Sequence, residues 1–547
     1  MVISKIYFVI ILIKSLHLTF LQVFINEGNS LRTILVLFDT LNRSALGGYG
    51  GTEVATPNFD RFAARAECFQ NHYAGSLPCM PARRDLHTGR MNFMHRSWGP
   101  LEPFDNSLPA LLGADGIYSH LITDHFHYFE DGGANYHTRF TSWDLIRGQE
   151  YDTWKPVVSP DTQRYKKQYS NKNYNNPNES NRLQHQVNRD YIQNEEEHPG
   201  PRCFKAALEF LEVNKNADNW FLQLECFDPH EPFFVPDHYK ENLPESSYNG
   251  PILDWPRYGP GEYQPEEVAE LRRNYHALVA MCDKHFGHVL DYLDENDMWK
   301  DTAVIVTTDH GFLLGEHDWW GKNIPPYFEE ISHIPLMVHV PDSFEIFPKN
   351  NQCVTQTHDL MPTILDLYGL KIPKEVLGRS ILKAKPLDRT AIFGQFGGPI
   401  GASDGRHVLY IYPSSLEHKG LFEYTLMPSH LKLPFGLDEL KHATLAEPFD
   451  FTKNTPLLRV PAEKGQNRRT PGERWKLMTA FDTALYDTLS DPKQMNPIED
   501  RIIKEQLVAA IIETLDSHDA PQELYERFDF KRSQLTQSLG ENQNEIF

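Results

Sequence analysis

The most constraining feature of this sequence is a pair of continuous apolar runs that each end in ionisable residues. The run 33–38 reads TILVLF and precedes Asp39, and the run 303–308 reads AVIVTT and precedes Asp309 and His310. A continuous β-branched run predicts a strand that is buried on both faces, as in a parallel sheet. Ligands of open α/β sheets bind beyond the carboxyl ends of the strands. We therefore expect Asp39, Asp309 and His310 to lie at one edge of a sheet.

Helical patterns lie between these two strands. The stretch from Pro265 to Leu293 carries apolar residues at three- and four-residue spacing, which is typical of one face of a long helix. Alternating strands and helices predict an α/β fold, in which a large and mostly parallel sheet is covered by helices on both faces. A chain of 547 residues suits a large domain plus a smaller one. We predict a main domain over 31–400 and a smaller C-terminal α+β subdomain over 401–547, where Pro- and Gly-bearing loops become frequent.

The segment 165–198 differs in composition from its surroundings. It is rich in Asn, Gln, Tyr and Glu and poor in aliphatic residues. This composition predicts an exposed insertion that ends in a polar helix, and it favours a solvated loop over a lid above a functional site.

The first thirty residues form a separate extension. Lys5 precedes the apolar run 6–13, Lys14 follows it, and a second apolar stretch reaches Ile25. A basic start and a short apolar core resemble a signal peptide, which predicts a secreted or periplasmic protein. The run is too short to predict a membrane span. The alternative is a start codon assigned upstream of the true one, which would leave the protein in the cytoplasm.

Charge and cysteine content exclude several classes of protein. The formal net charge of -22 argues against nucleic acid as a partner, because binding a phosphate backbone requires an excess of Lys and Arg. A small anionic substrate is compatible with this charge, since solvent and salt screen distant groups. The 6 cysteines are scattered, without the spacing of a disulfide scaffold or of a zinc site. Most of them are expected to be buried thiols.

One cysteine lies in a distinctive context. The segment 79–90 reads CMPARRDLHTGR. Pro81 suits the first turn of a helix, so Cys79 would lie where free amides and the helix dipole favour an anion. A cysteine in a short pattern is most often only a buried apolar residue. This segment, however, resembles the signature of the formylglycine-dependent sulfatases of the alkaline phosphatase superfamily. The resemblance implies that a formylglycine-generating enzyme oxidises Cys79 to formylglycine and that Arg83 steadies the product.

The resemblance extends from about residue 33 to residue 500 and implies an alkaline phosphatase-like fold and a mechanism. In this family the aldehyde is hydrated to a diol. One hydroxyl attacks sulfur and displaces the alcohol, and loss of a proton from the other then expels sulfate and restores the aldehyde. The implied substrate is a sulfate monoester of a carbohydrate or of another small organic alcohol.

The resemblance also implies one divalent metal ion. Asp39, Asp309, His310 and the modified Cys79 match the family's ligand positions, and oxygen-rich sites suit hard cations. The commonest pattern has a second aspartate where this chain has Thr40. The site therefore has one carboxylate fewer, and it has a histidine where some relatives have asparagine. These two differences are compatible with Mn²⁺, Mg²⁺ or Zn²⁺, but Ca²⁺ is the expected ion. Taken alone, Asp39 would be a capping residue after a strand.

Two further residues match family positions near the scissile bond. His230 lies in the segment DPHEP at 228–232, after the apolar run 220–224. The resemblance makes it the general acid, and a group that titrates near neutral pH suits leaving-group protonation. Lys322 matches the lysine that binds a sulfate oxygen and helps to protonate the leaving group. Without the resemblance, a surface turn and a solvated lysine would be the simpler interpretations.

The loop after the predicted strand near 120 departs from the family pattern. Many sulfatases have Lys-Trp-His there, whereas this chain has His125-Phe126-His127. By this alignment His127 would hydrogen-bond the formylglycine hydroxyl, and His125 would replace the sulfate-binding lysine. The alternative is that both histidines are structural.

Two other functions compete with sulfate hydrolysis. A phosphonate monoester or phosphodiester hydrolase of the same fold is one, because Thr40 and the Asp309-His310 pair resemble that branch. A catalytically inactive metal- or glycan-binding relative is the other. The presence of Cys79 and of the predicted acid His230 argues against inactivity.

Overall fold

The computed structural model describes residues 31–174, 180–323, 327–346, 353–382, 389–413, 420–462 and 481–532. The predicted signal segment 1–30 lies outside the described residues. Within the described ranges, no helix combines the length and the apolar composition that a membrane crossing requires.

The core of the fold is a 7-stranded sheet with the order β2-β11-β8-β1-β6-β4-β5. Its strands are β2 (Glu67–Cys68), β11 (Leu336–His339), β8 (Thr302–Thr307), β1 (Arg32–Phe38), β6 (Trp220–Cys226), β4 (Tyr118–Thr123) and β5 (Ser142–Leu145). β1 pairs in parallel with both β6 and β8. β11 pairs antiparallel with both β8 and β2, and β4 pairs in parallel with β5 and β6. The mostly parallel sheet that the two apolar runs predicted is confirmed.

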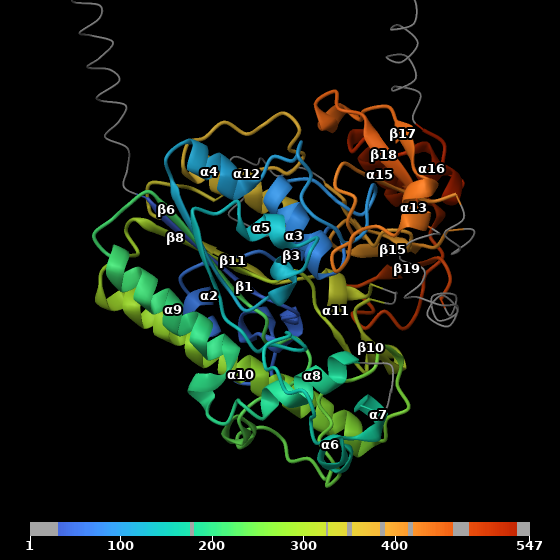
Figure 1. The fold of residues 1–547 in the computed structure, drawn as a ribbon. Coiled ribbons are helices and arrows are strands. Elements are labelled where there is room, and N and C mark those ends of the chain that lie inside the picture. The colour runs from blue at the N-terminus through green and yellow to red at the C-terminus, as the bar shows by residue number, and fades with distance from the viewer. Residues whose placement is uncertain are drawn as a thin grey trace, which may run out of the picture.

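Helices cover both faces of this sheet (Figure 1). Alternate residues of β1 point to opposite faces, so Ile34 and Val36 belong to one apolar cluster and Leu35 and Leu37 to the other. The first face packs against α2 (Pro57–Ala63), α9 (Pro199–Asn214) and α10 (Pro265–Glu295). The second packs against α3 (Cys79–Thr88), α4 (Leu108–Ala114) and α12 (Leu360–Leu367). Burial on both faces explains why the β1 sequence is apolar throughout.

The long helix α10 follows the predicted pattern closely. Pro265 occupies its first turn, and Glu267 accepts a hydrogen bond from the Gln264 backbone N–H at 2.7 Å. These features define the start of the helix. Its buried face includes Leu271, Tyr275 and Phe286, in agreement with the predicted apolar spacing.

The insertion 165–198 is packed rather than solvated. It lies mostly in α6 (Thr162–Gln168), α7 (Asn171–Tyr174) and α8 (Ser180–Arg189). Tyr165, Tyr169 and Val187 form a buried apolar cluster within it. The polar helix at its end is confirmed as α8. The prediction of a solvated loop is wrong. It rested on the scarcity of aliphatic residues, but the tyrosine rings supply the apolar area that packs the segment.

The C-terminal part is built from antiparallel sheets and helices, which Figure 1 shows beside the main sheet in orange and red. A 4-stranded sheet contains β13 (Ala391–Gly394), β14 (Ile400–Ser403), β15 (His407–Ile411) and β19 (Ala484–Asp487). Helix α15 (Arg501–Ser517) packs on it through Leu507 and Ile511. A 3-stranded sheet contains β16 (Phe422–Thr425), β18 (Leu457–Pro461) and β17 (Thr444–Ala446). The smaller α+β part is therefore present, and the boundary at 400 stays a prediction.

Candidate active site

The ends of β1 and β8 meet at the carboxyl edge of the sheet. Asp39 follows β1, and Asp309 and His310 follow the neighbouring strand β8. Thr40 adopts a left-handed backbone with φ of 67° and donates from its N–H to Asp309 Oδ1 at 3.2 Å. Its hydroxyl donates to Asp39 Oδ1 at 2.7 Å. The sharp turn at Thr40 thus joins the two carboxylates that the sequence placed at this edge.

Cys79 begins helix α3 and faces these strand ends. Its Sγ lies 3.1 Å from His310 Nε2, and the residue is only 3% exposed. The segment is anchored by Asp85, which accepts hydrogen bonds from the backbone N–H groups of Ser76 at 2.6 Å and Asn92 at 2.7 Å. These bonds fix α3 relative to the segments that precede and follow it.

Four side chains converge into a candidate metal site. One ligand atom from each of Asp39, Cys79, Asp309 and His310 lies within 4.8 Å of the others, and all four residues are buried. These are the four residues that the family resemblance implied. His310 Nδ1 lies 2.9 Å from the Gly311 carbonyl oxygen, which accepts its proton and leaves the Nε2 lone pair directed into the cluster.

The charge states of these ligands suit a divalent cation. Burial alone would raise the pKa of Asp39, but the charged guanidinium of Arg83 holds it well below its usual value, so the carboxylate is ionised. Burial lowers the pKa of His310, which keeps the imidazole neutral as metal binding requires. Two carboxylates, an imidazole and an oxygen in place of the Cys79 sulfur would form a site for a hard cation.

Arg83 lies behind the cluster and is fully buried. Its guanidinium donates to Asp309 Oδ2 at 2.6 Å, to Asp39 Oδ2 at 2.9 Å, and through Nε to Glu225 Oε1. Burial disfavours the charged form, but Glu225 and the two aspartates raise the pKa of Arg83 well above its usual value. Arg83 therefore stays charged and fixes the orientation of both aspartates.

Glu225 is a residue that the sequence reasoning missed. It lies in β6, where its carboxylate also accepts hydrogen bonds from Tyr128 Oη and Gln223 Nε2, each at 3.0 Å. A glutamate inside the buried strand WFLQLEC was the available signal, because a charge is buried only with partners.

Lys322 also lies beside the cluster, with its Nζ 3.9 Å from Asp39 Oδ1. It follows β10 (Trp319–Gly321) and donates from Nζ to Thr40 Oγ1 at 2.9 Å and to Glu231 Oε2 at 3.3 Å. Burial would lower the pKa of Lys322, but Glu231 and Asp39 contribute to a net increase. The ammonium group therefore persists beside the cluster, where the resemblance implied a cation.

His230 also lies at the site, after the end of β6. Its ring is centred 4.0 Å from the Phe227 ring, and its Nδ1 contacts the Glu231 carbonyl oxygen. Burial, followed by Lys322, lowers the pKa of His230 well below its usual value. This differs from the expected value near neutrality, because the sequence does not reveal how deeply the ring is buried. His230 is neutral here, and a bound anion would raise its pKa again.

The two histidines of the 125–127 loop occupy different surroundings. His125 Nε2 lies 3.4 Å from Asp39 Oδ2, and burial followed by Arg83 lowers the pKa of this ring well below its usual value. His127 Nδ1 lies 2.7 Å from Glu130 Oε2, and the two histidine rings are 5.1 Å apart. The structure brings His125 against the metal cluster as a neutral ring. Sulfate binding by His125 and a hydrogen bond from His127 to the nucleophile stay predictions.

The fold and the site together define an α/β protein with a buried candidate metal centre that includes a cysteine. The family model for sulfatases matches residues 32–370, and the chain belongs to the sulfatase family. The prediction from the segment 79–90 is thereby confirmed at the level of the family.

The curated relatives include a sulfatase and a multifunctional protein of the alkaline phosphatase superfamily. Iduronate 2-sulfatase of Mus musculus is 26% identical over 413 residues, which cover 63% of this chain and 71% of the relative. The multifunctional alkaline phosphatase superfamily protein PehA of Trinickia caryophylli is 28% identical over 416 residues, covering 66% and 76%.

Solved structures support the fold. BT4656, in complex with its substrate D-glucosamine-2-N,6-O-disulfate, matches with a TM-score of 0.59 and 15% identity over 90% of this chain and 99% of that one. The phosphonate monoester hydrolase of Silicibacter pomeroyi matches with a TM-score of 0.52 and 20% identity over 70% and 87%. At this identity the matches establish the α/β architecture alone.

Proposed function

We propose that this sulfatase-family hydrolase cleaves sulfate monoesters with a formylglycine nucleophile made from Cys79. The observation that carries the proposal is the position of Cys79, at the start of a helix and 3.1 Å from His310 within the metal cluster. Burial, followed by Asp39, raises the pKa of the Cys79 thiol well above its usual value. A protonated thiol is a poor nucleophile, so the unmodified side chain does not suit catalysis.

The surrounding residues have complementary roles in this proposal. Asp39, Asp309 and His310 would hold one divalent ion, with Ca²⁺ as the expected choice. Such an ion polarises a sulfate oxygen and lowers the pKa of a hydroxyl group. The Lys322 ammonium group binds a sulfate oxygen, and its fixed charge favours the transition state as negative charge develops. His230, which takes up a proton once the bound sulfate raises its pKa, passes that proton to the oxygen of the departing alcohol.

The substrate class follows from the same site and from the relatives. The mouse relative is an iduronate 2-sulfatase, and BT4656 binds a sulfated glucosamine. Both names support a carbohydrate sulfate ester, or another small organic sulfate, as the substrate of this chain. Maturation by a formylglycine-generating enzyme is part of the proposal.

Mass spectrometry of the tryptic peptide 66–83 tests the modification. We expect the aldehyde form at Cys79 when the chain is produced with a formylglycine-generating enzyme, and the thiol when it is produced without one. Aryl sulfate turnover should follow the aldehyde fraction. Full turnover by protein with an unmodified thiol would refute the proposal.

A phosphonate monoester or phosphodiester hydrolase is the second candidate. Thr40 favours it because this hydroxyl, rather than a second aspartate, contacts Lys322 and Asp39. The likeness to the phosphonate monoester hydrolase of Silicibacter pomeroyi also supports it. Parallel kinetics with an aryl sulfate, a phosphate monoester, a phosphate diester and a phosphonate separate the two candidates. A kcat/KM for phosphonate or diester well above that for sulfate would establish the second one.

A further inference from the structure

His127 and Glu130 form a carboxylate–imidazole pair beside the metal cluster. They lie in and directly after the short helix η3 (Phe126–Phe129), and His127 Nδ1 is 2.7 Å from Glu130 Oε2. The His127 ring is centred 5.1 Å from that of His125, whose Nε2 lies 3.4 Å from Asp39 Oδ2. One imidazole ring, that of His125, therefore links the pair to a predicted metal ligand.

The charge states of the pair fix the position of the ring proton. Burial alone would raise the pKa of Glu130, but the hydrogen bond from His127 and the nearby ammonium group of Lys432 lower it below its usual value, so the carboxylate is ionised. Burial lowers the pKa of His127, so the imidazole is neutral. An ionised carboxylate only accepts hydrogen bonds, so Nδ1 carries the proton and Nε2 keeps its lone pair. Among the described residues, no hydrogen bond reaches Nε2 of His127.

The C-terminal part of the chain supplies a cation to this pair. Lys432 Nζ lies 3.7 Å from Glu130 Oε1 and donates a hydrogen bond to the hydroxyl group of Tyr151. The Tyr151 ring is in turn centred 6.1 Å from the His127 ring. One carboxylate oxygen of Glu130 thus faces the imidazole and the other faces the ammonium group, which fixes the orientation of the carboxylate.

Close backbone contacts fix the segment that carries this lysine. The Gly132 N–H donates to the Leu431 carbonyl oxygen at 2.7 Å. A Cβ atom at Gly132 would collide with the carbonyl oxygen of His430. A Cβ atom at Gly133 would collide with the carbonyl oxygen of His127. Because glycine has no Cβ, these two positions permit a backbone approach that other residues would block.

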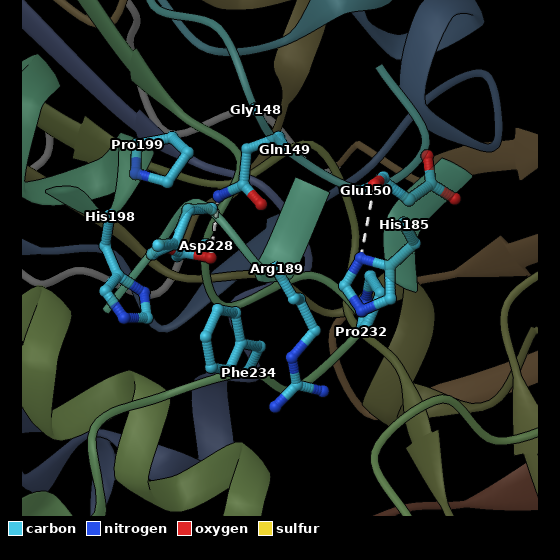
Figure 2. Close-up of a pocket in the computed structure, with 11 residues that line it drawn as sticks. Gly148, Gln149, Glu150, His185, Arg189, His198, Pro199, Asp228, Pro232 and Phe234 are labelled. Atoms are coloured by element: carbon cyan, nitrogen blue, oxygen red, sulfur yellow. Dashed lines mark hydrogen bonds between the residues drawn. The ribbon is translucent and has the colours of Figure 1, made fainter. Parts of the chain in front are cut away.

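Side-chain hydrogen bonds fix the segment that carries Tyr151. Gln149 Nε2 donates to Asp228 Oδ1 at 2.9 Å, the bond drawn between them in Figure 2, and to Asp124 Oδ2 at 3.2 Å. Asp124 directly precedes His125, so this glutamine ties the Tyr151 segment to the start of the histidine loop. Three parts of the chain that are distant in sequence therefore converge on the carboxylate–imidazole pair.

We propose that Glu130 is a positioning residue, which holds the Nδ1 proton of His127 so that Nε2 accepts a hydrogen bond from a formylglycine hydroxyl group. Lys432 holds the Glu130 carboxylate in this orientation. The inference rests on the proposed function, and it assigns the direction of the bond between His127 and the nucleophile.

The pair acts in the step that releases sulfate. The sulfated formylglycine carries one remaining hydroxyl group. The C–O bond to sulfate breaks and sulfate leaves with the bonding electrons, while the O–H electrons form the carbonyl double bond and the proton passes to Nε2 of His127. The Glu130 carboxylate then lies against an imidazolium and stabilises its charge. The imidazolium loses this proton to water, and hydration of the aldehyde regenerates the diol.

Pre-steady-state kinetics with 4-nitrophenyl sulfate test this assignment. Glu130→Gln keeps the shape of the side chain, but a carboxamide can donate to Nδ1 and thereby move the ring proton to Nε2. We expect kcat to fall about 10- to 100-fold and KM to fall in parallel, because sulfate release then lacks its proton acceptor. A burst of nearly one equivalent of 4-nitrophenol should precede the slow turnover, and the quenched peptide 66–83 should carry sulfated formylglycine.

Three further variants separate positioning from a structural role. Glu130→Asp keeps a carboxylate and should lose less activity than Glu130→Gln, and Lys432→Met should lower kcat about three- to tenfold. Glu329→Gln is a matched control, because Glu329 Oε2 contacts His333 Nδ1 in a similarly buried pair away from the metal cluster. It should leave kcat unchanged. Wild-type kcat in Glu130→Gln, a loss of kcat without a burst, or Glu130→Asp slower than Glu130→Gln would overturn the assignment.

The position of the ring proton provides a test that does not depend on turnover. The ¹⁵N chemical shifts of histidine-labelled protein report which ring nitrogen carries the proton, and His127→Gln identifies the His127 signals. We expect the proton on Nδ1 in wild type and on Nε2 in Glu130→Gln, and the same tautomer in both would overturn the proposal. A wild-type enzyme that hydrolyses no sulfate ester would refute the proposed function instead, and the tautomer measurement would then decide the role of Glu130.

Discussion

The contact between Glu225 and Arg83 permits a sharp test of how the metal site is supported. Both side chains are fully buried, and Glu225 also accepts hydrogen bonds from Tyr128 and Gln223. Glu225→Gln keeps the shape but removes one negative charge beside Arg83. The charge of the guanidinium is then balanced only by Asp39 and Asp309, to which it also donates hydrogen bonds and which are the predicted metal ligands.

We expect two effects of Glu225→Gln. Weakening charge-assisted hydrogen bonds inside the protein should lower the free energy of unfolding by about 1–3 kcal/mol. Loss of an outer-shell charge should weaken divalent metal binding about 10- to 100-fold, because such partners orient the ligands and tune their charge. Thermal unfolding measures the first effect, and titration of activity with Ca²⁺ after chelation measures the second.

Glu102→Gln provides the matched control. Glu102 contacts Arg96, and both side chains are as fully buried as those of Glu225 and Arg83, but neither residue belongs to the metal cluster. This variant should lose stability and keep its affinity for metal. If Glu225→Gln lost stability to the same extent and bound metal as tightly as wild type, Glu225 would only stabilise the fold and the reasoning would be refuted.

Three further outcomes are expected. Cys79→Ala should abolish sulfate ester turnover. The metal content, measured by elemental analysis, should persist because the aspartates and His310 still hold the ion. Loss of the metal as well would show that the side chain at position 79 is an essential ligand. Lys322→Ala should lower kcat/KM about 100- to 1,000-fold, because a preorganised charge at the sulfate is removed, and a loss below about tenfold would place sulfate elsewhere. Burial raises the pKa of Asp228 to about 7. Between about pH 4 and 7 this carboxyl group therefore keeps its proton in the folded protein but has lost it in the unfolded chain. The contribution of Asp228 to stability should therefore fall as pH rises from about 4 to 7. Asp228→Asn should remove that contribution, so thermal unfolding of the variant and of wild type should differ in pH dependence over this range; identical pH dependences would contradict the shift.

The fold was predictable because a strand that is buried on both faces consists of apolar residues, which can be read directly from the sequence. The run 33–38 is apolar at every position since both faces of β1 are covered, and Asp39 marks the point where the strand leaves the core. Asp309 and His310 do the same for β8. The four residues of the metal cluster were therefore identifiable from strand ends together with the signature at Cys79.

The supporting residues were harder to predict because their roles depend on distant contacts. Glu225 contacts Arg83 across 142 positions of sequence, and Lys322 contacts Thr40 across 282. No local pattern connects such pairs. The protonation state of His230 was equally inaccessible, because its pKa depends first on burial and then on Lys322.

Thr40 illustrates how a departure from a family pattern acquires physical meaning only in three dimensions. In sequence it is a missing aspartate, which weakens the expected metal site by one carboxylate. In the structure its hydroxyl donates to Asp39 and accepts a hydrogen bond from Lys322. It thereby couples the metal ligand to the cation that would bind the substrate. A second aspartate would offer no proton to Asp39 and would add repulsion between neighbouring carboxylates. Because this chain has Thr40 there instead, its side chains hold an ion with one negative charge fewer. Discrimination between Ca²⁺ and softer divalent ions should therefore depend on Thr40 and His310 together.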